Sequence, residues 1–216
     1  MKFASREEAG RQLGRHLRRL KLAVDVVLGL PRGGVVVAAQ VAALLERPLD
    51  VLIVRKIGHP LHREFAVGAL AESNVVILDE ASIGKNPLVR MQLENVIAEE
   101  TERLQSYRAR FHSAPPPALE GKAVLLVDDG LATGATAEAA VLSARRQGAR
   151  NVVVAVPVAS PTAVERVAGA ANDVVALLAD PAFGAVGQYY EKFDETTDEQ
   201  VLALLRAPPR GGSGTS

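Results

Sequence analysis

The sequence has no cysteine and no excess of charge of either sign. Without cysteine there are no disulfides, no thiolate metal sites and no cysteine nucleophile. The 25 Lys and Arg residues balance the 25 Asp and Glu residues. No overall field therefore attracts nucleic acid or an anionic membrane. Binding of an anion must depend on a local site.

Long apolar runs are missing as well. None approaches the roughly 18 residues of a membrane span, and residues 1–8 are too charged to begin a signal peptide. We therefore expect a cytoplasmic protein with no membrane partner. A chain of 216 residues suits one α/β domain rather than two full-sized ones. We expect a single domain over residues 1–207 and a disordered Gly-, Pro- and Ser-containing tail over 208–216.

Short β-branched runs alternate with helical patterns along the chain. Ser5 and Glu8 have the spacing of a capping box and predict a helix over 6–20. Strands are predicted at 24–30, 51–55, 75–78, 123–127, 152–156 and 174–178, with helices running to residue 45 and over 135–147 and 162–168. Apolar strands that alternate with helices predict an α/β fold with a Rossmann-like parallel sheet flanked by helices.

The region at about 80–115 does not fit a plain wound sheet. An apolar stripe recurs at helical spacing through Leu93, Ile97, Leu104, Tyr107 and Phe111. It predicts a long helix between residues 85 and 112 that forms an arm or hood, ended by a proline-rich break at 113–117. The stripe packs either against its own chain or against a partner, such as the second copy of a homodimer.

The segment 124–136, VLLVDDGLATGAT, is the most informative part of the sequence. Its apolar run predicts a buried strand that ends in Asp128 and Asp129, at the edge where open α/β sheets bind ligands. Two adjacent carboxylates need cations or hydroxyl donors to offset their charge, and ribose hydroxyls and hydrated Mg²⁺ meet that need. The pattern predicts a sugar-phosphate site.

The glycines and threonines of the same segment suit a phosphate. Gly130 and Gly134 permit backbone conformations that let successive N–H groups converge on an anion, and Thr133 and Thr136 add hydroxyl donors. The following helix contributes its positive end. An ordinary βα turn in which Asp129 caps a helix is the alternative. A P-loop is excluded because its Gly-Lys-Ser/Thr ending is absent.

Two acids followed by Gly-x-x-Thr-Gly-x-Thr resemble the 5-phosphoribosyl-1-diphosphate (PRPP) signature of the type I phosphoribosyltransferases. The resemblance covers roughly residues 25–180. It implies that Asp128 and Asp129 hold the ribose hydroxyls, and Mg²⁺ through water. It also implies a 5-phosphate loop made by Gly130, Leu131, Ala132, Thr133, Gly134, Ala135 and Thr136.

Two further segments resemble parts of the same family. Arg32, Gly33 and Gly34 follow the first core strand, like the family's pyrophosphate loop, although a simple turn would look similar. Arg55 and Lys56 resemble a basic pair of the adenine and orotate enzymes. The resemblance makes Arg32, Lys56 and Asp129 the expected catalytic residues. Residues 58–65 are the expected lid, from which His62 or Arg63 would reach the diphosphate.

The activity implied is transfer of phosphoribose from PRPP to a nitrogen base, with Mg²⁺ and release of pyrophosphate. A regulatory domain that binds PRPP or a nucleotide without turnover stays open, as does one domain of a larger assembly. The base is not assigned, because neither the hypoxanthine-guanine nor the orotate features are found. Aromatics are 4% of the chain. Phe183, Tyr189 and Tyr190 either stack on the base or anchor the carboxyl-terminal segment.

Overall fold

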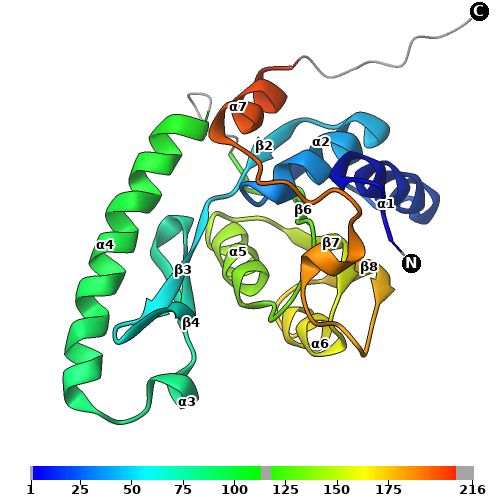
Figure 1. The fold of residues 1–216 in the computed structure, drawn as a ribbon. Helices are drawn as coiled ribbons and strands as arrows, with labels where there is room; N and C mark the ends of the chain where they lie inside the picture. Colours follow the sequence, from blue (N-terminus) through cyan, green and yellow to red (C-terminus); the bar gives the residue numbers. More distant parts are fainter. Residues whose placement is uncertain (1, 113–117, 208–216) are drawn as a thin grey trace, which may run out of the picture.

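The structure is a computed structural model that describes residues 2–112 and 118–207 (Figure 1). Its helices are α1 (Arg6–Leu20), α2 (Gly33–Leu45), α3 (Glu80–Ile83), α4 (Pro87–Phe111), α5 (Ala135–Arg146), α6 (Pro161–Ala168) and α7 (Asp198–Arg206). Its strands are β1 (Val26–Gly29), β2 (Leu49–Val51), β3 (Val54–His59), β4 (His62–Ala71), β5 (Val75–Leu78), β6 (Ala123–Val127), β7 (Asn151–Ala159) and β8 (Asp173–Ala179). The predicted break at 113–117 and the predicted disordered tail lie outside the described residues.

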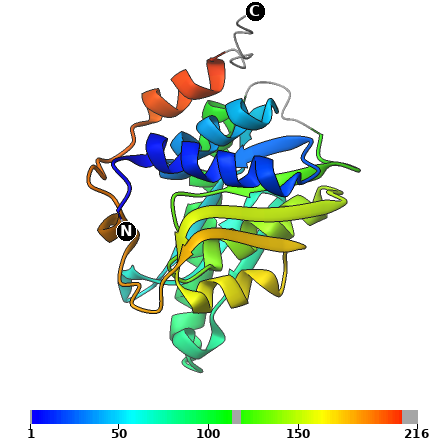
Figure 2. The same ribbon diagram turned by 90° about the vertical axis from the view of Figure 1, so that its right-hand side faces the viewer.

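Five strands form a parallel sheet in the order β2-β1-β6-β7-β8. Side chains alternate across it, as the two-residue period of a strand requires. Val26 and Leu28 pack in the core beneath α5 and α6, whereas Val27 packs in the core beneath α1 and α2. Figures 1 and 2 show these helix pairs on opposite faces. The predicted fold class is confirmed.

The strand order reverses between β1 and β6, and this reversal positions the candidate site. The chain passes from β1 through α2 to β2 on one side, and from β6 through α5 to β7 on the other. Gly29 and Val127, the last residues of the two central strands, are register partners. The loops that follow them therefore leave the same edge side by side, which is where α/β sheets bind ligands.

A separate antiparallel sheet, β3-β4-β5, corrects two predictions. The strand predicted at 51–55 divides, because β2 ends at Val51 in the parallel sheet and β3 begins at Val54 in the other. The strand at 75–78 forms, but it pairs antiparallel with β4 instead of joining the core. Strand β4 was missed because the charged first half of its sequence reads as a loop, although Val67–Ala71 carries buried residues such as Leu70.

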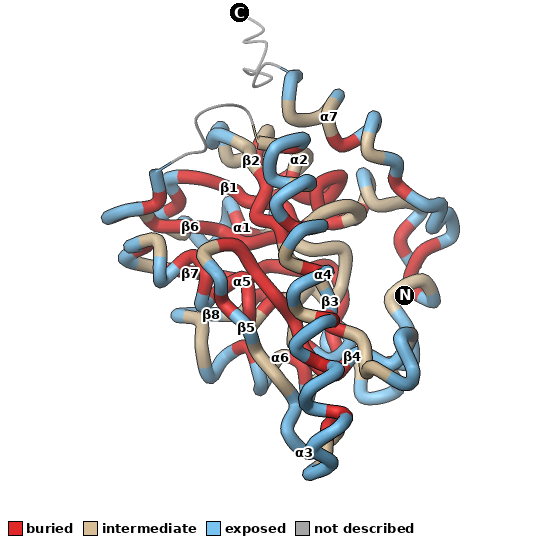
Figure 3. The backbone as a smooth tube through the Cα atoms, turned by 90° about the vertical axis from the view of Figure 1, so that its left-hand side faces the viewer, coloured by how far each residue is buried: buried red, intermediate tan, exposed pale blue. Residues whose placement is uncertain are grey.

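The predicted arm is α4, which begins at Pro87 after an Asn86 cap and ends at Phe111. Its apolar stripe is covered by the chain itself, because Leu93, Leu104 and Phe111 are buried in one cluster with Ile57 of β3. Figure 3 shows that exposed positions lie along the outward side of this helix. The stripe is therefore not free for a partner. Among the described helices, none has the length and apolar character needed to cross a membrane.

The start of the described chain meets residues 189–191 beside the sheet. The backbone N–H of Phe3 donates to Tyr189, and the N–H of Glu191 donates to the carbonyl of Phe3, each at 2.8 Å. The chain then continues into α7, a helix that the sequence analysis did not predict. Thr197 and Gln200 form a capping box at its start. Helix α7 packs beside α2 and the end of α4 (Figure 1).

A buried ionic cluster joins the end of the arm to both sheets. His112 Nε2 lies 2.8 Å from Glu72 Oε1, and His112 Nδ1 lies 3.4 Å from Asp50 Oδ1. Glu72 also accepts from the backbone N–H of Ile53 at 2.8 Å. Burial alone would lower the pKa of His112, but the two carboxylates outweigh it and raise this pKa to about 9.

We expect this histidine to make folding stability depend on pH. A histidine with a raised pKa stabilises the fold fully below its unfolded pKa of 6.5, and that contribution disappears as the pH rises through about 9. The measurement is the free energy of unfolding in urea for the wild type and His112→Gln, below pH 6.5 and above pH 9. The difference between the two proteins should shrink at the higher pH. An equal difference at both would contradict the assignment.

Candidate functional site

Asp128 and Asp129, called the acid pair below, lie in the loop that leaves β6 for α5. The backbone N–H of Asp129 donates to Asp128 Oδ1 at 2.8 Å, so the first carboxylate turns back over its neighbour. Leu131 is fixed to the end of β7, where its N–H donates to Val158 and its carbonyl accepts from Ser160, both at 2.9 Å. The loop is thus tied to the sheet on both sides of Gly130.

The backbone between Leu131 and α5 presents unused donors. Among the described residues, the N–H groups of Ala132, Thr133 and Gly134 donate to no protein acceptor. Gly134 has a φ of 77°, a conformation that favours glycine, and Ala135 and Thr136 begin the helix behind it. Gly130 is needed because of space rather than φ, since a Cβ there would lie 2.8 Å from Val186 Cγ1. The predicted phosphate loop therefore has the free amides that an anion requires.

The turn that begins α2 packs directly on the acid pair. A Cβ on Gly33 would lie 2.2 Å from Asp129 Oδ2, and one on Gly34 would lie 2.7 Å from Asp128 Oδ1. Only glycine fits this approach without displacing a carboxylate. The structure thus brings together two segments that the sequence analysis connected only through family resemblance.

Burial and two adjacent carboxylates determine the electrostatics of the site. Burial and the neighbouring charge of Asp129 raise the pKa of Asp128 well above its usual value, while Lys56 and Arg6 act in the opposite direction. Burial, and then the charge of Asp129, raise the pKa of Tyr190. Burial and the second carboxylate therefore both disfavour the charged form of Asp128.

Arg6 is a site residue that the sequence analysis missed. Its Nε donates to Asp129 Oδ2 at 2.7 Å, and the two side chains are only 12% and 14% exposed. Its Nη1 donates to the carbonyl of Asp194 at 2.7 Å, and its guanidinium lies 3.8 Å from the ring centroid of Phe193. The contact joins residues 123 apart in sequence. No local pattern signals it.

The basic pair Arg55 and Lys56 alternates along β3, so its two side chains have different surroundings. Arg55 Nε donates to Glu100 Oε2 of the arm at 2.9 Å, and its guanidinium lies over the ring of Tyr107. Lys56 forms no ion pair within the described residues and lowers the pKa of Asp128. Of Arg55 and Lys56, only Lys56 therefore acts electrostatically on Asp128.

The segment expected to be a lid forms the tip of a hairpin instead. Residues 58–65 lie at the ends of β3 and β4, with His59 paired to His62. Arg63 extends to the arm, where its Nη1 lies 3.1 Å from Glu99 Oε2. The prediction of a loop was wrong because turn and charged residues were read without their strand pairing. Neither His62 nor Arg63 is shown near the acid pair.

The aromatic residues proposed for base stacking mainly anchor the carboxyl-terminal segment. Tyr189 and Tyr190 are buried, and their hydroxyls donate to Asp180 Oδ2 at 2.8 Å and to the Asp129 carbonyl at 2.6 Å. Phe183 stacks on Tyr189 at 5.4 Å between centroids. Phe193, the fourth aromatic residue of the same segment, is the more exposed ring and lies beside Arg6.

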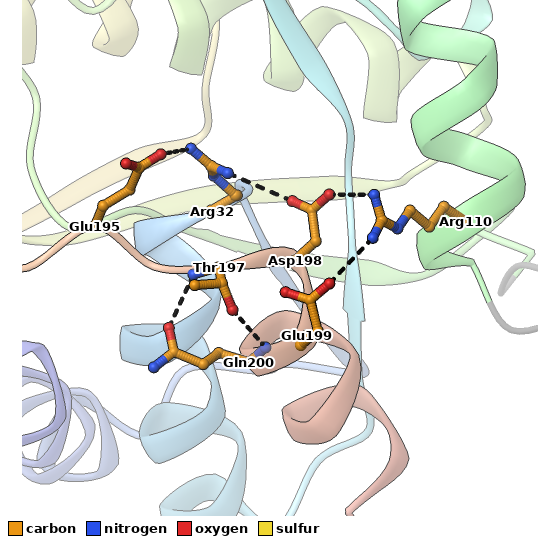
Figure 4. Close-up of polar contacts among 7 residues, drawn as sticks. All are labelled: Arg32, Arg110, Glu195, Thr197, Asp198, Glu199 and Gln200. Carbon is orange, nitrogen blue, oxygen red and sulfur yellow. Dashed lines mark hydrogen bonds and ion pairs between the residues drawn. The ribbon is translucent and has the colours of Figure 1, made fainter.

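Arg32 is held by carboxylates that come from the far end of the chain (Figure 4). Its Nη2 donates to Glu195, and its Nη1 lies 3.5 Å from Asp198 Oδ1 at the start of α7. Asp198 and Glu199 also contact Arg110 at the end of the arm. The predicted diphosphate residue is thus part of an ionic network that joins α2, α4 and α7.

The acid pair fits a hydrated Mg²⁺. Asp128 Oδ2 and Asp129 Oδ1 accept no hydrogen bond within the described residues, so each carboxylate keeps one free oxygen. No cluster of three or more His, Cys, Asp or Glu side chains suited to a metal occurs in that part of the chain. Mg²⁺ commonly uses one or two carboxylates, water and substrate phosphates rather than a complete protein cage. The donors present meet that requirement.

A parallel sheet with helices on both faces and an acid pair at its carboxyl edge define an α/β domain of the phosphoribosyltransferase type. The family model of the phosphoribosyl transferase domain matches residues 6–193, so the chain belongs to this family. A candidate phosphoribosyl transferase of Mycobacterium tuberculosis strain H37Rv is 44% identical over 204 residues, which are 94% of this chain and 46% of that protein. The chain therefore spans about half the length of the curated relatives it matches.

Solved structures agree on the fold. The crystal structure of TT1426 from Thermus thermophilus is 46% identical, with a TM-score of 0.77, and the match covers 95% of this chain and 98% of that one. A Neisseria gonorrhoeae protein solved with bound ppGpp is 14% identical with a TM-score of 0.50, over 95% and 97% of the two chains. The second likeness bears on the fold alone.

Removal of Arg6 should destabilise the protein. Arg6→Ala leaves a partly buried carboxylate beside a second one without its cation, so we expect the free energy of unfolding to fall by about 1–3 kcal/mol. Urea denaturation measures the change. Arg11→Ala is the matched control, because Arg11 is exposed on the same helix and forms no ion pair in the described structure. Equal stability of the two variants would show that the contact contributes little.

Proposed function

We propose that the protein is a phosphoribosyltransferase that uses PRPP and Mg²⁺, attaches phosphoribose to a nitrogen heterocycle and releases pyrophosphate. The observation that carries the proposal is the contact of the Gly33–Gly34 turn with Asp128 and Asp129, beside a loop of free amides. A ligand with a sugar diol, a phosphate and a diphosphate matches these three neighbouring groups. Family membership supports the same reaction class.

The residues of the chain would divide the ligand among them. Asp128 and Asp129 would accept from the ribose hydroxyls, and the segment 130–136 would bind the 5-phosphate through its amides, its threonine hydroxyls and the amino end of α5. The Gly33–Gly34 backbone, Arg32 and Lys56 would hold the diphosphate and stabilise the charge that it gains on leaving. Bound Mg²⁺ would supply Lewis-acid stabilisation of the diphosphate oxygens.

The acceptor site is proposed to lie near Arg6 and Phe193. Phe193 places a partly exposed ring beside the arginine that contacts Asp129, so a planar heterocycle could stack close to the ribose site. Tyr190 packs against Phe193, with 5.1 Å between the two ring centroids. The aromatic contact suits a base, without choosing between purine and pyrimidine.

Removal of both acidic charges tests the site. We expect Asp128→Asn with Asp129→Asn to weaken PRPP binding about a hundredfold or more, because each lost charge-assisted hydrogen bond costs about 1.5–3 kcal/mol. Calorimetric titration with PRPP and Mg²⁺ measures the affinity. Asp173→Asn is the control, since Asp173 is an exposed residue at the opposite edge of the sheet. Unchanged affinity of the double variant would remove the acid pair from the site.

Turnover needs a second measurement on the same protein. A screen for pyrophosphate release across free purines, pyrimidines and related heterocycles should identify one acceptor. Binding of PRPP without release on any base would favour the regulatory alternative, in which the site senses PRPP or a nucleotide. Absence of PRPP binding to the wild type would refute the proposed function itself.

A further inference from the structure

Arg6 and Arg32 both contact one short segment, residues 194–198, which we call the strap. The strap runs from the residue after Phe193 to Asp198, the first residue of α7. Its Asp194 carbonyl accepts from Arg6 Nη1 at 2.7 Å, and its Glu195 and Asp198 carboxylates contact Arg32. The strap therefore supplies acceptors to the cations on both sides of the ligand site.

The charges in Figure 4 are unfavourable for an approaching anion. Two cations, Arg32 and Arg110, face three carboxylates, Glu195, Asp198 and Glu199, which leaves the cluster one negative charge in excess. A guanidinium presents the same planar donors to a carboxylate as to a phosphate. Glu195 thus uses a donor that a diphosphate on Arg32 would also need.

The two carboxylates on Arg32 differ in how firmly they are held. The side chain of Asp198 is 13% exposed and also contacts Arg110, whereas that of Glu195 is 77% exposed. Glu195 has no other ion pair in the described part of the chain. It also lines a cavity of about 560 Å³ between the strap, helix α7 and residues of α1 and α2. Glu195 can therefore leave Arg32 without unpacking the core.

The position of the strap in the chain connects the Arg32 contact to helix α7. The family match ends at residue 193, so the strap and α7 lie beyond the matched domain. Helix α7 packs on α2, and Asp198 and Glu199 at its start reach Arg110 of the arm. Through Asp198, Arg32 thereby contacts a helix outside the family's matched region.

We propose that Glu195 competes with the diphosphate of the ligand for Arg32, so that ligand binding displaces Glu195 from this arginine. The inference rests on the proposed function, which assigns Arg32 to the diphosphate. Glu195 thereby lowers the affinity of the site for the diphosphate.

Calorimetric titration of the full chain with pyrophosphate and Mg²⁺ tests the competition. We expect Glu195→Gln to bind pyrophosphate about two- to fivefold more tightly than the wild type, the range given by an exposed ion pair of about 0.4–1 kcal/mol. Glu199→Gln is the matched control. Its side chain is also 77% exposed, but it contacts Arg110 instead of Arg32. This control should bind like the wild type.

A double-mutant cycle shows whether the effect passes through Arg32. In an Arg32→Ala background, Glu195→Gln should give no gain in affinity. A gain that persists there, or equal gains from Glu195→Gln and Glu199→Gln, would indicate general charge repulsion and overturn the inference. So would unchanged or weaker binding by Glu195→Gln, while PRPP still binds the wild type. If the wild type binds neither pyrophosphate nor PRPP, the proposed function fails, and the inference fails with it.

Discussion

The organisation of this site follows from the repulsion between two adjacent carboxylates at the end of a buried strand. Asp128 and Asp129 follow five buried residues of β6, so the core holds them in place and they cannot separate by much. Burial, and then the charge of Asp129, raise the pKa of Asp128 above its usual value. Groups that offset the charge must come from elsewhere in the fold. The surrounding structure supplies Arg6 from the first helix and, at longer range, Lys56 from the antiparallel sheet.

The same constraint explains the close approach of the β1–α2 turn. Because β1 and β6 are neighbours at the point where strand order reverses, their loops leave one edge together. Gly33 and Gly34 allow that turn to reach the carboxylates with no intervening side chain. The candidate site for a charged ligand thus lies where two loops share a sheet edge. Strands hold this edge, and backbone and short side chains face it.

Much of the fold could be predicted from the sequence, because helix and strand patterns are local. Helix α1, strand β6 and the arm α4 lie where capping and apolar spacing placed them. Local pattern could not tell that β3 and β5 join a separate antiparallel sheet, since this depends on pairing with β4. Within the site, the motif 128–136 was readable because its residues are contiguous. Arg6 was not, because its contact with Asp129 is created only by folding.

The network around Asp198 joins a later segment to the candidate site without adding a residue to its motif. Helix α7 begins five residues after the family match ends, yet its first residue contacts both the α2 turn and the arm. An aspartate at a helix amino terminus is stabilised by the helix dipole, so this carboxylate is held in place independently of Arg32. Glu195, in the unwound segment before it, lacks that support. A fixed and a displaceable carboxylate on one guanidinium form a contact that can respond to an anion while α7 stays anchored through Arg110.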